Sequence, residues 1–516
     1  MAKAQPLMSR FCHRTSVIGR LAACLAIVAC FLVARPLHAQ VGGGGMGGMG
    51  GGMGGMGGGM GGGMGGMGGG MGGMGGMGMP GMGRMGFGFS PPSGVLIDAN
   101  GVLRMQSVAD GGLSVEHRKA AVAAFEGDLQ KSSKLRKVAL SRLEAEVRKA
   151  IEGGRGVPDA MEKLAGLTRV QYVFVYPAED GRPGEIVIAG PAEPWITDAT
   201  GRVRGVETGW PTVLLEDLAA AIRAFAPGQP QDRQIGCSID PKPEGLAAMQ
   251  AYLKKTGRVN PKGGTDAIVS GMKEALGTQT VSVFGVSPAT HFAQVLVEAD
   301  YRMKLIGIGL EPAPVKMKTW VDLTTGGAGQ NALQRWYFMP DYQCVKIAED
   351  DLAIQLVGQG VKLCGADEVV MPDGRRLDAN RADGASRTFT QTFTKKYPEI
   401  AARNPVYAQL RTLIDLAVVA AYMQEHDAYG KANWGAETLR DEQAYRIERL
   451  ETPREVETAI NAVWRGSKLI TPIGGGVTMH PRMALDAPNL LLDDKGEVAA
   501  TRAAAKDLPA GRWWWD

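Results

Sequence analysis

Few residues of the kinds that build metal and redox sites occur in this chain. The 516 residues include only six cysteines and six histidines, and neither type recurs at the short spacings of a zinc site. The metalloprotease pattern H-E-x-x-H is missing, and the glycine-rich stretches at 261–270 and 472–479 contain neither phosphate-binding pattern, G-x-x-x-x-G-K-[S/T] or G-x-G-x-x-G. We therefore expect no metal site, no cofactor and no recognised catalytic constellation in the folded part.

The N-terminus has the composition of a secretory signal. Four basic residues and no acid occur in the first 20 residues, an apolar run follows over 21–34, and Ala39 is a small residue suited to cleavage. The run is shorter than the roughly 20 residues of a membrane span. We predict a signal peptide over 1–39 and export to the periplasm, the cell envelope or the exterior. Cys24 and Cys30 also lie in lipobox-like stretches, so a lipoprotein anchor is the alternative.

Removal of this signal changes the charge and the cysteine content. Residues 1–40 contain five basic residues and no acid, so a chain of net charge +4 becomes −1. A nearly neutral surface does not attract nucleic acid, and we predict no nucleic-acid partner. Three cysteines remain, of which Cys344 and Cys364 are the predicted disulfide pair in an oxidising compartment; three buried free thiols including Cys237 are the alternative.

A glycine-rich segment follows, and half of all methionines lie in it. From residue 40 to 89 the chain is mostly glycine, and 13 of the 26 methionines occur between Met46 and Met85. Glycine supplies no core and loses the most conformational entropy on ordering, so we predict a disordered linker. Thioethers are soft ligands for Cu(I), and copper binding by this Met-rich tail is a secondary hypothesis beside a plain linker.

The remaining chain is predicted to be a mixed α/β (α+β) protein in three regions. The region 90–230 contains two hairpins, at 94–105 and 195–205, helices near 114–130 and 133–152, strands in 169–190 and a helix ending near 225. The region 231–375 alternates strands and helices, which favours some parallel pairing. The region 376–516 is mainly helical, with terminal strands, a third predicted hairpin at 490–500 and a Trp-rich tail.

Ser287 lies in the stretch Gly285-Val286-Ser287-Pro288-Ala289, which resembles the G-x-S-x-G turn of serine hydrolases. The residue after such a serine supplies a backbone N–H to the oxyanion hole, and Pro288 has none. A serine followed by proline is instead a common start of a helix. We therefore predict that Ser287 is the N-cap of a helix over 288–303, followed by a strand over 304–311.

This helix carries the candidate pocket or partner-surface residues. At about 100° per residue, His291, Glu298 and Arg302 share one face, with Glu298 and Arg302 in the favourable i,i+4 order. Asp300 projects beside the apolar face, where a carboxylate needs a partner or a raised pKa. Either these side chains line a pocket, or they form an ordinary solvated face in which Asp300 pairs with a basic residue.

The C-terminal region contains a predicted capped helix, a buried apolar helix and a cluster of tryptophans. The stretch 451–464 is predicted to be a helix with a capping box, in which Thr452 is the N-cap, Pro453 is at N1 and Glu455 is at N3. The apolar run near 412–422 favours a buried helix over a membrane span. Trp513 to Trp515 either stack on a sugar or partner, or fold back on the protein.

Four segments, "VIAGPAEPW", "CSIDPKPEGLAAMQ", "VSVFGVSPATHFAQVLVEADYRMKLIGIGLE" and "LITPIGGGV", together resemble a family of large exported planctomycete proteins catalogued as domain of unknown function 1598. The resemblance extends from about residue 92 to 485, and 234–311 is its most specific part. It implies export and a planctomycete-type source, and it implies no activity, cofactor or catalytic residue.

These observations favour an exported, non-enzymatic interaction module on a flexible Gly/Met-rich arm, whose partner is a protein or polysaccharide of the cell envelope. The alternative is a hydrolase or carbohydrate-active enzyme of unrecognised type that uses His291, Glu298 and Asp300. That alternative requires the three side chains to converge in one pocket within hydrogen-bond reach. Copper binding by the Met-rich tail is the second alternative.

Overall fold

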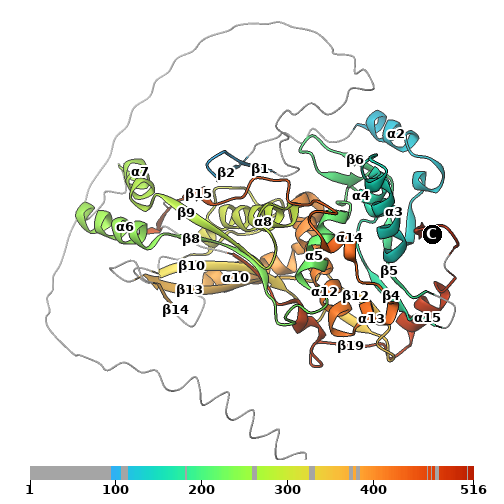
Figure 1. Ribbon diagram of the computed structural model, residues 1–516. Helices are drawn as coiled ribbons and strands as arrows, with labels where there is room; N and C mark the ends of the chain where they lie inside the picture. The colour runs from blue at the N-terminus through green and yellow to red at the C-terminus, as the bar shows by residue number, and fades with distance from the viewer. Residues whose placement is uncertain are drawn as a thin grey trace, which may run out of the picture. The chain divides into compact units, whose positions relative to one another are not determined.

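Two mixed β-sheets and a set of helices between and around them form the part of the chain that the computed structural model describes (Figure 1). The described residues are 94–105, 114–179, 183–257, 264–324, 332–370, 376–378, 384–461, 463–465, 468–470, 476–507 and 509–516. The predicted signal peptide (1–39) and the Gly/Met segment (40–89), with its copper hypothesis, lie outside these residues. The mixed α/β class is as predicted.

The larger sheet has nine strands and takes strands from all three predicted regions. In spatial order they are β1 (Val95–Ile97), β2 (Val102–Met105), β15 (Glu455–Glu457), β9 (Thr278–Phe284), β8 (Ile235–Pro241), β18 (Gly476–Met479), β10 (Ala332–Pro340), β13 (Val361–Val370) and β14 (Arg376–Asp378). Parallel pairs occur between β15 and β2 and between β10 and β18, and both join segments from different regions. Parallel pairing was predicted within 231–375, but the pairs of this sheet that lie inside that region, β8–β9 and β10–β13, are antiparallel.

The smaller sheet has seven strands and is likewise assembled from distant segments. Its order is β19 (Leu491–Leu492), β11 (Val345–Ile347), β12 (Ala353–Leu356), β4 (Tyr172–Tyr176), β5 (Glu185–Ala192), β3 (Ser133–Ala139) and β20 (Trp514–Trp515). The last strand, β20, contains two of the terminal tryptophans. Trp514 pairs with Val138, and the Asp516 carboxylate accepts two hydrogen bonds from the buried Arg136. The tail therefore folds back on the protein.

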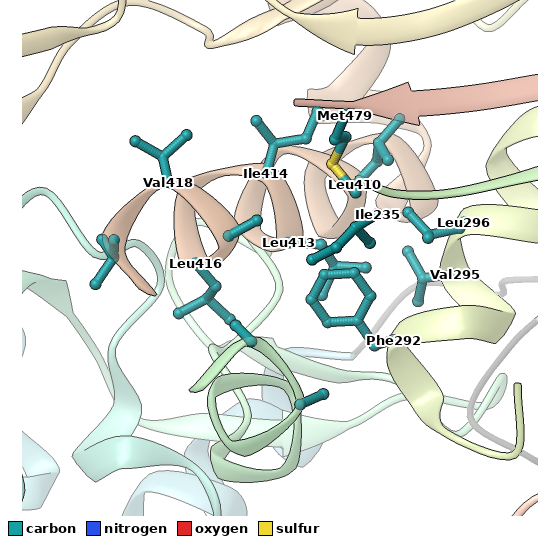
Figure 2. Packing of buried hydrophobic residues seen from close by; sticks show 14 of the residues in the cluster. Ile235, Phe292, Val295, Leu296, Leu410, Leu413, Ile414, Leu416, Val418 and Met479 are labelled. Carbon is teal, nitrogen blue, oxygen red and sulfur yellow. The ribbon is translucent and has the colours of Figure 1, made fainter. Parts of the chain in front are cut away.

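One helix forms the centre of the core. The 21-residue helix α12 (Pro405–Glu425) packs against α5 (Leu215–Ala224) and α8 (His291–Gly307). Figure 2 shows Leu413 of α12, Phe292 of α8 and Ile235 of β8 meeting in this core. Among the described helices α12 alone is long and apolar enough to cross a membrane, and its most apolar stretch is entirely buried in the protein. It is the buried core helix that its short apolar run predicts.

The other elements surround this core. Small two-stranded ribbons are formed by β6 (Trp195–Thr197) with β7 (Val203–Gly205) and by β16 (Val463–Arg465) with β17 (Lys468–Ile470). The remaining helices are α2 (Val115–Ala123), α3 (Leu140–Glu152), α4 (Asp159–Glu162), α6 (Pro243–Thr256), α7 (Thr265–Leu276), α9 (Trp320–Leu323), α10 (Gly384–Lys395), α11 (Tyr397–Arg403), α13 (Ala428–Ala432), α14 (Glu437–Arg440) and α15 (Glu497–Ala504), with short 3-10 turns η1 (Gly127–Gln130), η2 (Leu164–Gly166) and η3 (Pro481–Leu485).

Both predicted N-caps are wrong. Helix α8 begins three residues after the expected point, and its N-cap is Thr290, whose hydroxyl accepts a hydrogen bond from Ala293 N at 3.3 Å. Ser287 lies in the preceding turn, where its carbonyl accepts from the Thr290 hydroxyl at 2.7 Å. Thr452 caps no helix, because the segment after it becomes β15. Val456 of β15 is buried between β2 and β9, so tertiary packing overrides the local capping signal.

Three further segments differ from the prediction. The expected helix 133–152 begins as β3, because residues 133–139 pair with β5 inside the smaller sheet. The expected strand 304–311 begins inside α8, which continues to Gly307. The expected third hairpin at 490–500 is a short strand followed by α15. Asp493 accepts hydrogen bonds from three backbone N–H groups of that helix, so the same Asp-x-x-Gly pattern starts a helix here.

Candidate functional site

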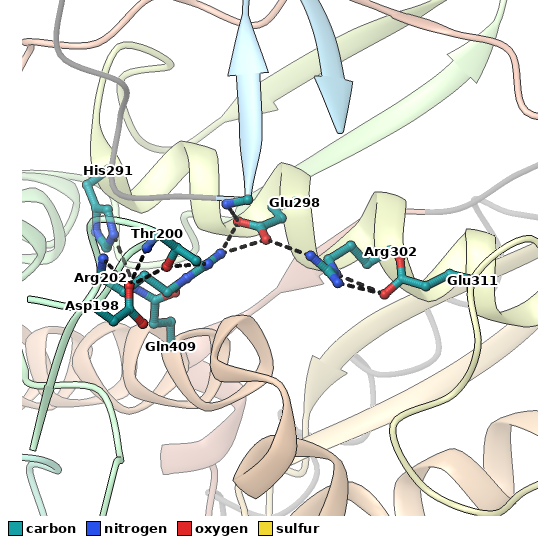
Figure 3. A network of polar contacts seen from close by, with 9 residues as sticks. Asp198, Thr200, Arg202, His291, Glu298, Arg302, Glu311 and Gln409 are labelled. Atoms are coloured by element: carbon teal, nitrogen blue, oxygen red, sulfur yellow. Dashed lines mark hydrogen bonds and ion pairs between the residues drawn. The ribbon is translucent and has the colours of Figure 1, made fainter. Parts of the chain in front are cut away.

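The polar face of α8 is buried, contrary to a solvated face. His291, Gln294 and Glu298 expose 2%, 1% and 0% of their surface. Figure 3 shows His291 and Glu298 beside Arg202 of the β6–β7 hairpin and Gln409 of α12. His291 also contacts Asp217 of α5, and Gln294 donates a long hydrogen bond to the Glu451 carbonyl. A buried charge is tolerated only when it is paired and hydrogen-bonded, so these residues depend on one another for a place in the core.

Glu298 is the centre of this network. Both carboxylate oxygens lie 2.6 Å from Arg202 Nη2, and Gly94 N donates to Glu298 Oε2 at 3.1 Å. The predicted i,i+4 pair is confirmed: Arg302 Nη1 lies 3.4 Å from Glu298 Oε1, and Arg302 also donates to Glu311 at 2.8 Å. A Cβ at Gly94 would lie 2.6 Å from Glu298 Oε1, so the close approach requires glycine.

The β6–β7 hairpin places Arg202. Asp198 Oδ1 accepts from the backbone N–H groups of Thr200 and Arg202 at 2.8 and 3.1 Å, which fixes the turn as an Asx turn. From this turn the guanidinium of Arg202 reaches Glu298 and also donates from Nε to Gln409 Oε1 at 2.9 Å. The sequence predicts the hairpin; its role as the holder of a buried arginine depends on distant partners.

His291 forms the second half of the network. Its Nδ1 lies 2.9–3.0 Å from both oxygens of Asp217 on α5, and its Nε2 lies 3.3 Å from Gln409 Nε2 on α12. Burial alone favours the neutral imidazole, but the Asp217 carboxylate, assisted by Glu216, outweighs this effect and raises the pKa of His291 above its ordinary value. The Asp217 carboxylate therefore holds a proton on His291 Nδ1, the ring nitrogen that faces it.

A cavity of about 220 Å³ adjoins this pair. It is lined by polar side chains from several segments, with some apolar ones, namely Asp159, Lys163, Thr197, Arg202, Val203, Thr212, Leu214, Glu216, His291 and Gln409, together with Gly201. Burial raises the pKa of Glu216, and the charge of Asp217 adds to this rise, whereas His291, Arg449 and Lys163 oppose it. Within the described residues, Glu216 forms no hydrogen bond or ion pair, and the buried Thr212 hydroxyl has no hydrogen-bond partner.

Asp300 lies apart from this cavity. Its carboxylate is fully buried and pairs with Lys304 at 3.2 Å, while Lys304 also donates to the Ile239 carbonyl of β8 at 3.1 Å. Burial raises the pKa of Asp300 to about 6, against the opposing effect of Lys304. Of the four predicted residues, His291 lines the cavity. Glu298 contacts the lining residue Arg202, and Arg302 contacts Glu298. Asp300 is the carboxylate that pairs with a basic neighbour.

Ser287 and the cysteines show no catalytic arrangement in the described structure. Ser287 lines a separate cavity of about 360 Å³, and its hydroxyl accepts a long contact of 3.5 Å from Ala289 N. The possible Cys344–Cys364 disulfide is not formed, and the alternative of free thiols holds for Cys344, Cys364 and Cys237. The reason is the topology, because Cys364 lies in β13 of the larger sheet, whereas Cys344 directly precedes β11 of the smaller one. No group of three or more His, Cys, Asp or Glu among the described residues is placed to hold a metal ion.

Most of the residues that surround His291 carry no signal in the sequence that marks them as site residues. Asp217 and Glu216 lie at the start of an otherwise apolar helix, and an acidic pair there is also typical of a solvated first turn. Arg202, Thr212 and Gln409 carry no local pattern at all. Arg202 and Gln409 contact α8 across 96 and 118 residues of sequence, and these contacts form only when the sheets assemble.

Comparison with known proteins identifies one family match. Residues 237–320 match the family described as "Protein of unknown function (DUF1598)". The match runs from within β8 to the first residue of α9 and contains His291, Glu298 and Asp300, in agreement with the most specific part of the expected resemblance. It does not include Asp217, Arg202 or Gln409, which complete the network. No curated protein and no solved structure matches the chain.

Proposed function

We propose that this protein is an exported binding protein of the cell envelope, which holds a small polar ligand, free or as part of a larger envelope partner, in the cavity beside His291. The Gly/Met-rich segment 40–89 would serve as the arm that carries the folded part. One observation supports binding most directly: Glu298, Arg202 and His291 are paired with one another's neighbours, but two groups that line the cavity are not, because Glu216 forms no hydrogen bond or ion pair with the described residues and the buried Thr212 hydroxyl has no hydrogen-bond partner among them. Polar groups without partners in a preformed cavity are the usual means of orienting a ligand.

Binding is favoured over catalysis because the reactive groups are already engaged. Both ring nitrogens of His291 have side-chain neighbours at hydrogen-bond distance, and Glu298 accepts from Arg202, Arg302 and Gly94. A general base needs a free lone pair directed at the substrate. These groups instead hold α5, α8, α12 and the hairpin in fixed positions around the cavity.

A thermal-shift screen of monosaccharides, amino sugars, amino acids and short carboxylic acids tests the proposal. At a ligand concentration of about 100 Kd, binding to the native state adds roughly 2.7 kcal/mol of stability. We expect at least one class to raise the melting temperature of the wild type. Thr212→Val should reduce that rise, whereas Thr280→Val, an exposed threonine on β9, should preserve it. Equal shifts in both variants would place binding elsewhere.

Export is tested separately. N-terminal sequencing of the protein recovered outside the cytoplasm of its host should give Gln40 as the first residue, from cleavage after Ala39. A mature N-terminus at a lipid-modified cysteine would establish the lipoprotein alternative. Recovery of the uncleaved chain in the cytoplasm would contradict export.

Acid–base hydrolysis is the second candidate function. It is favoured by the Asp217–His291 pair, which lies beside Glu216, a carboxyl group whose pKa is raised. The predicted set of His291, Glu298 and Asp300 does not form the site, because Asp300 does not line the cavity. Turnover of chromogenic glycosides or esters that is lost in Glu216→Gln would establish this function. Labelling of Ser287 by a fluorophosphonate would instead show a serine nucleophile.

Copper binding by the Met-rich tail remains a third, independent proposal. Its support is the run of thioethers between Met46 and Met85. Titration of a synthetic 46–85 peptide with Cu(I) should give saturable binding. A peptide with each methionine replaced by leucine is the matched control, and equal behaviour of the two peptides would remove the proposal.

A further inference from the structure

The charges that line the cavity beside His291 do not cancel. Arg202 is neutralised by Glu298 at 2.6 Å. Lys163 lies 3.6 Å from Asp159 and 3.3 Å from Glu162, so its charge is also matched. Glu216 forms no ion pair with the described residues, and Arg449 and Lys163 favour its charged form only through space. An anionic ligand would therefore meet no uncommitted cation on these walls.

The Asp217–His291 pair does not compensate Glu216. Asp217 is itself a carboxylate, and it holds the imidazole at 2.9 Å from behind the cavity wall. With His291 protonated, this pair is neutral as a unit, and the carboxylate of Glu216 is left over. With His291 neutral, the surroundings are more negative still. In both states the cavity favours a positive charge.

Thr212 is the second group on the cavity wall that a ligand can contact. Its side chain is 5% exposed and lines the cavity, and its hydroxyl has no partner among the described residues. A buried hydroxyl without a partner costs about 1–3 kcal/mol, and a ligand that hydrogen-bonds to it recovers this penalty. Gln409 is not available in the same way, because its amide oxygen accepts from Arg202 and its amide nitrogen faces His291.

From these contacts we infer that the cavity binds a small organic cation that also carries hydroxyl groups, such as an amino sugar or an amino alcohol, with its ammonium group beside Glu216 and a hydroxyl beside Thr212. The inference rests on the proposed binding function and names its ligand class. The volume of about 220 Å³ lies below the range of drug-sized sites, which restricts the ligand to roughly the size of one sugar ring.

Three probes of the same ring size test the charge requirement. Glucosamine carries an ammonium group, glucose replaces it with a hydroxyl, and glucuronate carries a carboxylate. Calorimetric titration of the purified protein near neutral pH should show glucosamine binding about tenfold more tightly than glucose, as expected for one charge-assisted hydrogen bond, with glucuronate weakest. Glucose binding equally or more tightly, or glucuronate binding most tightly, would overturn the inference.

Two variants assign the preference to its residues. Glu216→Gln keeps the shape of the side chain and should remove the advantage of glucosamine over glucose, while Glu457→Gln, at an exposed residue of β15, should leave it unchanged. Thr212→Val should weaken both sugars by about tenfold. Far-UV circular dichroism and the melting temperature confirm that each variant is folded. A glucosamine preference that survives Glu216→Gln would overturn the inference.

The outcomes separate this inference from the proposed function. If none of the three probes binds but another class from the thermal-shift screen does, and Thr212→Val weakens that class, then the ligand class is wrong and the binding function stands. If no ligand from either experiment binds, both fail.

Discussion

Removal of Arg202 provides the sharpest test of the buried network. Arg202 and Glu298 expose 5% and 0% of their side chains, and Arg202→Met keeps most of the volume while it removes the charge. Breaking a buried pair from one side costs about 3–5 kcal/mol, because the other charge stays in the core. Glu298 keeps Arg302 at 3.4 Å and the Gly94 N–H at 3.1 Å. These remaining partners place our expected loss at the lower end, about 3 kcal/mol.

The assay is urea unfolding of wild type and variants, followed by tryptophan fluorescence. The matched control is Arg482→Met, which removes an arginine from a more exposed pair with Glu425 at 3.2 Å, and for which we expect a loss of about 0–1 kcal/mol. The double variant Arg202→Met/Glu298→Leu removes both charges and should recover at least half of the loss. If Arg202→Met unfolds within about 1 kcal/mol of the control, the pair is not a buried, mutually dependent unit.

Three further predictions follow from the titrating groups and the thiols. Since the folded-state pKa of His291 is raised, its contribution to stability is complete below the ordinary value of about 6.5 and is lost as pH rises through the folded value; Asp217→Asn should abolish this decline in urea midpoints, and an unchanged decline would refute the pairing. Asp300, with a pKa raised to about 6, should make the wild type lose stability as pH rises from about 4 through 6, by roughly 3 kcal/mol, and Asp300→Asn should flatten that slope. Alkylation of the unreduced, denatured protein followed by peptide mapping should label the three thiols of the folded part, which are Cys237, Cys344 and Cys364. A disulfide-bridged peptide would contradict this prediction.

The elements that sequence analysis predicted correctly have strong local signals. Helix α6 starts with Pro243 at its first turn and is followed by Gly257, and both signals act within a few residues. The first two hairpins depend on an Asp-x-x-Gly turn in the same way. Segment 133–139 lacked such a signal, because its strand is defined by pairing with β5 and β20. Local signals therefore predict an element only where no distant strand competes for it.

The candidate site also shows that local signals do not predict long-range contacts. The Glu298–Arg302 pair could be predicted, because i,i+4 neighbours are fixed by helix geometry. The burial of Glu298 could not, since it depends on Arg202, which is 96 residues away and is presented by a separate hairpin. Asp300 was correctly expected to need a partner or a raised pKa, and it has both. The needs of single residues could be predicted from the sequence. Which distant residues would come together around them could not.

The distinction between a structural network and a ligand site depends on which polar groups stay unsatisfied. Glu298, Asp217 and Arg202 have their hydrogen-bonding groups taken up by neighbours, so they explain why α5, α8 and the hairpin lock in one arrangement. Other buried groups without a partner, such as the Tyr429 hydroxyl, do not line the cavity beside His291. Thr212 combines an unpartnered hydroxyl with a place on that cavity wall. A rigid frame around a cavity whose wall contains an unpartnered polar group is the arrangement expected of a preorganised binding site.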